Sequence, residues 1–285
     1  MTEVRMPELW GVINVTPDSF SDGGRFLDAQ AAIAHGKRLL DEGADVLDVG
    51  GESSRPAGKT YGAGFTTVSA KEEIARVVPV IEQLAGELRA RVSIDTVKPE
   101  VAKAALGAGA SIVNDVGCAR IPALAEVAAA AGAEYVVMHN RGSGEVRPPH
   151  TSYDDVVSDV LEELLEGAGR VEAAGVPPAS IWLDPGLGFA KTAPQTLALL
   201  RSLGRFRKSG YRVLVGPSRK SFISELAPNP SGGAPSADDR LGGTAAAVAH
   251  CVASRVDAVR VHDVHVMRQL IDVMNALTQP AEGAP

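Results

Sequence analysis

The sequence has few cysteines, no long hydrophobic run and no excess of basic residues, and each absence excludes a class of protein. The two cysteines among its 285 residues, Cys118 and Cys251, lie far apart and outside any paired-spacing motif. A disulfide framework and a zinc site are therefore not expected. No run of about 18 apolar residues, the length needed to cross a membrane, occurs in the chain. Residues 1–10 lack the basic patch and apolar segment of a secretion signal, so we expect a cytoplasmic protein that does not bind membranes.

The charge balance is acidic. Aspartate and glutamate number 35 against 28 lysines and arginines, which gives a net charge of −7 and an isoelectric point near 5.4. This balance argues against a nucleic-acid-binding surface, although a local cationic pocket can still exist. An anionic ligand would therefore have to be bound by specific cationic residues.

Short apolar runs alternate along the chain with longer segments of helical period. Gly43, Gly109 and Gly132 each precede an alanine shortly before such a run, where a glycine can end a helix in the left-handed conformation. Eight of the runs are candidate strands: 9–15, 46–49, 92–94, 111–113, 135–138, 181–183, 212–215 and 258–261.

Eight strand–helix units predict a single-domain α/β protein, a closed (β/α)8 TIM barrel over residues 1–278 with a flexible tail at 279–285. An open doubly wound sheet is the alternative. The barrel is favoured because almost every run ends in a polar residue, and the carboxyl ends of barrel strands meet at one mouth where chemistry takes place. These polar residues are Asn14, Asp48 with Glu52, Asp95, Asn114, His139, Asp184, residues 218–220, and Arg260 with His262.

The most informative stretch is residues 14–24, where an apolar run ends in a polar, glycine-rich segment. An amide, two carboxylates, two serines and Phe20 are concentrated there ahead of a helical pattern that starts near Asp28. A loop that only connects two elements has no need of these groups, so the stretch predicts part of a functional site.

Two acids and an amide at neighbouring strand ends predict a grip on a flat heterocycle. Asp95, Asn114 and Asp184 end the third, fourth and sixth runs. Carboxylates accept pairs of hydrogen bonds from an amino–imino edge, and an asparagine adds one donor and one acceptor. The same residues also fit a metal site or an acid–base pair, although the lack of histidine immediately beside them disfavours zinc.

Cationic groups are expected on the opposite side of the mouth, where they suit a phosphate or pyrophosphate. We place Asn14, Arg55, Arg260 and His262 there. Residues 216–221 leave the seventh run and enter a helix, whose free amides can bind an anion. A carboxylate ligand near Ser221, with Lys220 reaching into the mouth, is the resulting hypothesis.

Several short motifs, in their order along the chain, resemble those of the dihydropteroate synthases, which are pterin-binding enzymes of folate biosynthesis. The resemblance runs from residue 10 to about residue 266, and the matching stretches are 14–24, 48–56, 93–99, 114–116, 138–139, 184–189 with Lys191, 218–221 and 260–263. It implies an eight-stranded barrel and a transferase that joins 4-aminobenzoate to (7,8-dihydropterin-6-yl)methyl diphosphate. The products are 7,8-dihydropteroate and pyrophosphate, and sulfonamides mimic the aminobenzoate. The resemblance also implies Mg2+ as cofactor and a homodimer.

The resemblance assigns roles residue by residue. It places the pterin between Asp95, Asn114, Met138, Asp184, Phe189, Gly216 and Lys220, with Arg260 flat against the ring. It places the pyrophosphate at Asn14, Arg55 and His262, and the Mg2+ at Asn14 and Asp22. It places the aminobenzoate between Phe20, Pro56, Phe189, Lys220 and Ser221. The groups expected to take part in catalysis are Asp95, Lys220, Arg55 and His262.

The implied mechanism is dissociative: the pterin carbon becomes cationic near Asp95 while pyrophosphate leaves, and the aminobenzoate amine then attacks. The chain departs from the common pattern at residues 57–67, a long segment that we interpret as a lid, and at Asn140, to which we assign no role. One rival is a methyltransferase module that presents methyltetrahydrofolate to a corrinoid protein. It would use Asp95, Asn114 and Asp184 but would leave the phosphate-binding and aminobenzoate-binding segments idle. A catalytically silent scaffold is a further rival.

Overall fold

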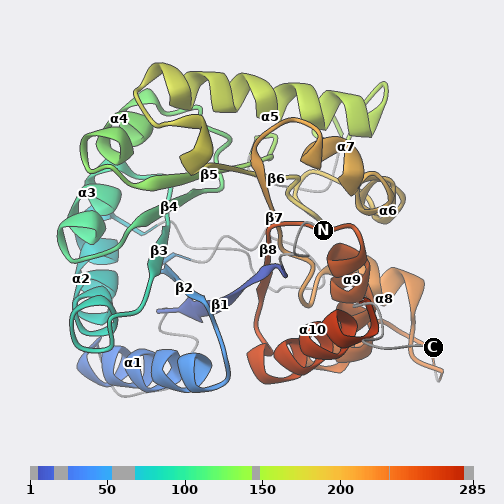
Figure 1. The fold of residues 1–285 in the computed structure, drawn as a ribbon, viewed down its shortest axis with the longest axis horizontal. Coiled ribbons are helices and arrows are strands. Elements are labelled where there is room, and N and C mark those ends of the chain that lie inside the picture. Colours follow the sequence, from blue (N-terminus) through green and yellow to red (C-terminus); the bar gives the residue numbers. More distant parts are fainter. Residues whose placement is uncertain (1–5, 16–24, 53–67, 143–147, 231, 279–285) are drawn as a thin grey trace, which may run out of the picture.

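The computed structural model describes residues 6–15, 25–52, 68–142, 148–230 and 232–278, with the side chains of residues 25–28 excepted. Over these ranges it is a closed barrel of eight parallel strands, paired in chain order from β1 to β8 and back to β1, with helices around the outside (Figure 1). The predicted fold is confirmed. Predictions for Phe20, Asp22, Arg55, Pro56 and the segment 57–67 lie outside the described residues, as does the predicted tail at 279–285.

All eight predicted strands are present within two residues at either end. Several continue into the polar residue that ends the apolar run, because the backbone ladder is indifferent to side-chain polarity. The strands are β1 Glu8–Asn14, β2 Val46–Gly50, β3 Val92–Asp95, β4 Ile112–Asp115, β5 Glu134–Met138, β6 Ile181–Asp184, β7 Arg212–Val215 and β8 Ala258–Val261.

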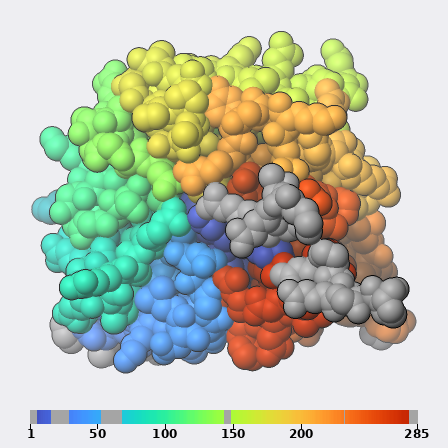
Figure 2. Space-filling model, in the orientation of Figure 1, coloured from blue at the N-terminus to red at the C-terminus, as the bar shows by residue number. Residues whose placement is uncertain are grey.

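Helices pack on the outer face of the barrel, and the first and last units close the ring side by side (Figure 2). Gly43, Gly109 and Gly132 have φ angles of 98°, 111° and 66°, which confirms the predicted left-handed helix ends. The helices are α1 Arg25–Asp41, α2 Ala70–Ile81 with the π-helical turn η2 Glu82–Glu87, α3 Pro99–Gly107, α4 Pro122–Ala130, α5 Val156–Ala173, η3 Pro178–Ser180, α6 Ala193–Arg201, α7 Leu203–Arg207, α8 Ser221–Leu226, η4 Asp238–Arg240, α9 Leu241–Ala253 and α10 Val264–Thr278. Among the helices described, none combines the length and apolarity of a membrane span.

A layer of large apolar side chains fills the middle of the barrel. Trp10 and Trp182 meet edge to face with ring centroids 5.3 Å apart, and both are fully buried. Val46, Ile112, Val136, Leu214 and Ala258 complete this cluster. Since side chains alternate in direction along a strand, the residues two positions further on also point inward, and they lie at the carboxyl-terminal mouth. The tryptophan layer is thus the floor on which the site is built.

Candidate active site

A buried cluster of opposite charges lies directly above this floor. Asp48 is fully buried on β2 and accepts hydrogen bonds from Arg260 Nε at 2.6 Å and from Asn114 Nδ2 at 3.1 Å. A terminal nitrogen of Arg260 lies 3.2 Å from Asp95 Oδ2. The second oxygen of Asp48, Oδ1, is buried without a hydrogen-bond partner. The Arg260 guanidinium therefore joins the polar ends of β2, β3 and β8, and Asn114 on β4 joins the cluster through Asp48.

This arrangement corrects the placement of Arg260 that we inferred from residue type. Arg260 does not lie with the residues predicted to bind phosphate, because its side chain extends from β8 past β1 to the carboxylates of Asp48 and Asp95. One guanidinium between two carboxylates offsets part of their mutual repulsion. The acidic side of the mouth thus contains its own cation.

Two carboxyl groups at the mouth, those of Asp95 and Asp184, hold their protons more strongly than usual. Burial and the neighbouring Asp48 carboxylate together raise the pKa of Asp95 to about 7, against the lowering effect of Arg260. Burial also raises the pKa of Asp184, whereas the hydrogen bond from Gly186 N–H and the charges of Lys220 and Arg260 lower it. Raised pKa values of buried acids are typical of functional sites. Both acids are therefore candidates for strong hydrogen bonds to a ligand in a pocket with few water molecules.

Asp184, the last residue of β6, and Phe189, on the loop between β6 and α6, form a second wall. Asp184 Oδ1 accepts a 2.7 Å hydrogen bond from Gly186 N–H. Phe189 is 9% exposed, and the Lys220 ammonium lies 4.1 Å from the centre of its ring. A Cβ on Gly216 would lie 3.9 Å from Arg260 Cβ and 4.0 Å from Asp184 Oδ2. The second wall and the charge cluster thus belong to one site, with Gly216 between them.

Asn14 and His262 lie together on the other side of the mouth. Both line a hollow of about 700 Å3, whose walls also contain His35, Arg38 and Arg219. The His262 ring is held by Ser218, with Nδ1 and Oγ 3.0 Å apart. The structure therefore brings together two of the three residues predicted for pyrophosphate, and the third, Arg55, lies outside the described residues.

The loop before α8 is held in a strained conformation. Arg219 has a φ angle of 60°, its N–H donates to Thr244 Oγ1 at 3.1 Å, and its carbonyl accepts from the buried Arg240 at 2.8 Å. Lys220 is the N-cap of α8, and Ser221 is the first helical residue. Non-glycine residues keep a positive φ only where surrounding contacts enforce it, so this loop presents Lys220 and Ser221 in a defined position.

Sequence reasoning missed the supporting residues of the site. Asp48 was noted as a polar strand end, but its contacts with Arg260 and Asn114 depend on the strand register. Arg240 and Lys191 are 2% exposed, which is unusual for charged side chains. Lys191 had one signal, its place in a motif of the resemblance. Arg240 had none, because an isolated arginine resembles many surface arginines.

The described residues fit a magnesium ion that takes few ligands from the protein. No group of three histidine, cysteine, aspartate or glutamate side chains capable of holding a metal occurs within the described ranges. Mg2+ commonly uses one or two protein oxygens together with water and phosphate oxygens. The amide oxygen of Asn14, at the hollow that it shares with His262, suits this role. Asp22, its predicted partner, lies outside the described residues.

The sequence and the fold have close counterparts among known proteins. Residues 10–262 match the family model for pterin binding enzymes. The dihydropteroate synthase of Synechocystis sp. is 42% identical, over 94% of this chain and 89% of the relative. That of Mycobacterium leprae is 43% identical, over 93% and 92%.

Solved structures agree with these relatives. The dihydropteroate synthase of Xanthomonas albilineans with 4-aminobenzoic acid has a TM-score of 0.87 and 39% identity, covering 97% of this chain and 95% of that chain. The same enzyme in complex with 7,8-dihydropteroate has a TM-score of 0.84 and 37% identity, covering 98% and 96%. The chain therefore belongs to the dihydropteroate synthases of the pterin-binding enzyme family.

Proposed function

We propose that the mouth of this barrel joins 4-aminobenzoate to (7,8-dihydropterin-6-yl)methyl diphosphate, forming 7,8-dihydropteroate and releasing pyrophosphate. The observation that carries the proposal is the buried cluster of Asp48, Asp95, Asn114 and Arg260, adjoined by Asp184 across Gly216. The Xanthomonas albilineans structures with 4-aminobenzoic acid and with 7,8-dihydropteroate support the substrate classes.

Pterin recognition is assigned to the acidic side of the mouth. The amino–imino edge of a pterin presents hydrogen-bond donors, and the Asp184 carboxylate can accept two of them. Asn114 donates to Asp48, so its amide is held in one orientation toward a ligand. Arg260, held by Asp48 and Asp95, provides a flat guanidinium against which the ring can stack. Met138 on β5 and Phe189 supply apolar contacts.

The C–O bond to the leaving pyrophosphate breaks between the acidic side of the mouth and its cationic side. As the C–O bond lengthens, positive charge develops on the pterin methylene carbon, and the ionised Asp95 stabilises it. Negative charge develops on the leaving pyrophosphate, which His262 and Arg55 neutralise while Asn14 orients it. A magnesium ion held by Asn14 and Asp22 would supply further neutralisation of the phosphate oxygens.

The second substrate is assigned to the wall made by Phe189 and Lys220. The ring of 4-aminobenzoate can pack against Phe189, and its carboxylate can pair with Lys220 beside the first amides of α8. Ser221, Phe20 and Pro56 are the other proposed contacts. The neutral amine attacks the cationic carbon and then loses a proton, so no nucleophile–base pair is needed.

Two further proposals concern the oligomeric state of the protein and its location in the cell. A homodimer is supported by the apolar side chains Val273 and Leu277 on α10, which are 59% and 76% exposed. A cytoplasmic location agrees with the lack of any membrane span in the described helices. The relatives named above all carry the synthase name, which favours this activity over methyl transfer to a corrinoid protein.

Pyrophosphate release tests the function directly. We expect the purified protein to release pyrophosphate from the pterin diphosphate when both Mg2+ and 4-aminobenzoate are present. The second product, 7,8-dihydropteroate, should appear in equal amount, as measured by chromatography. If pyrophosphate is released and no dihydropteroate forms, or if neither product appears, the proposal is wrong.

Pterin binding should depend on pH through Asp95. Protonation of Asp95 turns one of its oxygens into an O–H donor and weakens both as acceptors, so a pterin that presents donors binds the ionised form. Because the pKa is about 7 in the free protein, affinity for a phosphate-free pterin should fall about tenfold per pH unit well below that value. Calorimetric titration between about pH 5 and pH 8 measures this slope.

The matched variant is Asp95→Asn, which has no proton to release. Its affinity should be lower than that of the wild type at high pH and should change little over the same range. A wild-type affinity that does not vary with pH would contradict the role of Asp95 as an acceptor.

A further inference from the structure

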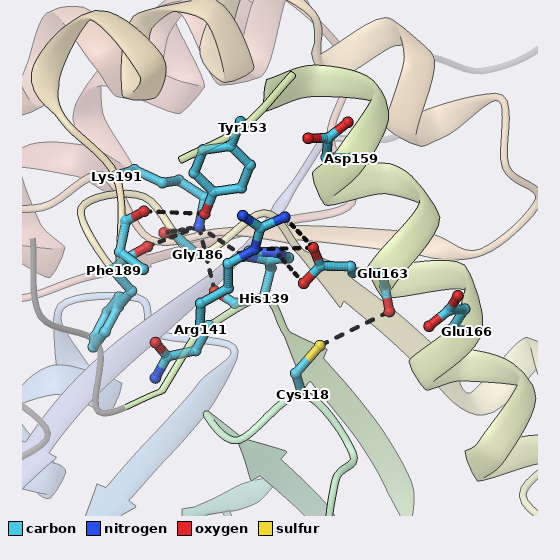
Figure 3. A network of polar contacts seen from close by, with 12 residues as sticks. Cys118, His139, Arg141, Tyr153, Asp159, Glu163, Glu166, Gly186, Phe189 and Lys191 are labelled. Atoms are coloured by element: carbon cyan, nitrogen blue, oxygen red, sulfur yellow. Dashed lines mark hydrogen bonds and ion pairs between the residues drawn. The ribbon is translucent and has the colours of Figure 1, made fainter. Parts of the chain in front are cut away.

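A network of polar side chains lies behind the wall that carries Phe189 (Figure 3). At its centre is Lys191, whose ammonium is buried and surrounded by acceptors. Lys191 Nζ lies 2.8 Å from His139 Nδ1, 2.9 Å from the Phe189 carbonyl and 3.1 Å from the Gly186 carbonyl. These three contacts use all the donors of a protonated lysine, and they favour that form although burial lowers the pKa of Lys191 to about 7. Lys191 thus ties the β6–α6 loop to the end of β5.

His139 and the helix α5 hold the other side of this ammonium. Because a protonated lysine only donates, His139 Nδ1 accepts and its Nε2–H donates to Glu163 Oε2 at 3.1 Å. Arg141 Nε lies 2.9 Å from Glu163 Oε1. Burial and the Lys191 charge together lower the pKa of His139 to about 4. The neutral ring is therefore an acceptor for Lys191 at neutral pH.

A second anchor holds the same loop from outside. Tyr153 Oη donates to the Ala190 carbonyl at 3.0 Å, and its ring is covered by the Arg141 guanidinium 3.9 Å from the ring centre. Three carbonyl acceptors of the loop, those of Gly186, Phe189 and Ala190, are thus held by Lys191 and Tyr153. The loop itself is conformationally demanding, since Gly186, Gly188 and Ala190 all have positive φ angles.

The residues of this network do not line the mouth. They hold the loop whose Phe189 side chain does line it. The Phe189 ring points away from the network in Figure 3 and contacts the Lys220 ammonium on the opposite side. Lys191 is 2% exposed and His139 is fully buried. Burying the Lys191 ammonium with only backbone carbonyls and a histidine as partners costs free energy, because the charge loses its hydration. A role in function would explain why this residue is kept.

We propose that Lys191 is a positioning residue for the aminobenzoate wall: it fixes the backbone of Phe189, and through the Phe189 ring it sets the position of Lys220. Tyr153 is the secondary anchor of the same wall. This inference rests on the proposed function, since Phe189 and Lys220 are the groups assigned to aminobenzoate. Asp184 depends less on Lys191, because it is the last residue of β6 and is held by the strand.

Two variants, each of which removes a cation, separate a role of Lys191 in positioning the aminobenzoate wall from a role in protein stability alone. Lys191→Met retains most of the unbranched side chain, shortens it by one heavy atom and removes its donors. The matched control is Arg212→Met at the amino-terminal end of the barrel, where Arg212 stacks on Trp182 at 3.8 Å and pairs with Glu134. Both variants should lower the melting temperature.

Only Lys191→Met should raise the aminobenzoate KM, by about tenfold or more. Its affinity for a phosphate-free pterin should stay within about threefold of the wild type. Arg212→Met should leave that KM within about twofold. An aminobenzoate KM that is unchanged in Lys191→Met, or raised equally in Arg212→Met, would overturn the inference.

Tyr153→Phe keeps the test decisive if Lys191→Met does not fold. It removes one hydrogen bond from the loop and retains the aromatic ring, so the aminobenzoate KM should rise about two- to fivefold. An unchanged KM in Tyr153→Phe would overturn the anchored-wall inference. The activity of the wild type distinguishes failure of the proposed function from failure of the role of Lys191. If the wild type releases no pyrophosphate, the proposed function is wrong. If the wild type is active and the variants keep its aminobenzoate KM, only the role of Lys191 is wrong.

Discussion

Asp184→Asn should weaken the binding of a phosphate-free pterin by about 30-fold or more, which corresponds to roughly 2 to 4 kcal/mol. The reason lies in how the side chain is held. Gly186 N–H donates to Asp184 Oδ1, so the oxygen of a substituted amide would keep that contact. Its NH2 group would then face the pterin, where a donor meets a donor in a desolvated pocket. Calorimetric titration measures the loss.

His262→Ala provides the matched comparison for Asp184→Asn. It should weaken binding of the pterin diphosphate and leave the phosphate-free pterin almost unaffected, because His262 lies on the pyrophosphate side with Asn14. A loss of less than about threefold in Asp184→Asn would remove Asp184 from the pterin contacts. Equal losses for both ligands in His262→Ala would mean that His262 supports the pocket and not the pyrophosphate.

Arg260→Met should destabilise the protein by about 3 to 5 kcal/mol near neutral pH. The variant leaves Asp48 without its guanidinium partner at a position that is fully buried, and it leaves Asp95 beside a like charge. Urea denaturation measures the change. The control Arg38→Met removes an exposed pair with Glu42, 3.6 Å apart, and should cost less than about 1 kcal/mol.

The pH dependence of this loss identifies its origin. Arg260 lowers the pKa of Asp95, so its removal raises that pKa further above the unfolded value. An acid whose folded-state pKa is raised stabilises the folded state less as the pH rises through that pKa. The Asp95 of Arg260→Met therefore takes up its proton at a higher pH than that of the wild type, so the destabilisation should shrink as the pH falls toward about 7 and level off below it, where both proteins are protonated. A loss below about 1 kcal/mol at neutral pH would mean that the buried charges are compensated in another way.

The strand assignment and the general location of the site could be read from the sequence, because both depend on local patterns. Asp95 and Asp184 follow apolar runs, and in a parallel barrel such residues must lie at the carboxyl-terminal mouth. The hypothesis that these strand ends bind a flat heterocycle followed from their acceptors. Phe20, Asp22, Arg55 and Pro56 remain predictions, since they lie outside the described residues.

The partners of the long charged side chains could not be read from the sequence. Arg260 was assigned to phosphate by residue type, yet its guanidinium crosses β1 to reach Asp48, 212 positions away in the chain. Lys191 is a surface residue by composition alone, but in the fold it is 2% exposed. In both cases the outcome depends on which carbonyls and carboxylates the closed barrel places within reach.

By itself, the sequence determined the eight strand–helix units and the end of the barrel at which chemistry takes place. These follow from periodicity and polarity, which act over a few residues. Only the tertiary structure decided that Asp48 joins Arg260 and Asn114, and that Lys191 supports Phe189 from behind. Such contacts depend on strand register and barrel closure, and these bring together residues whose separation in the chain carries no local signal.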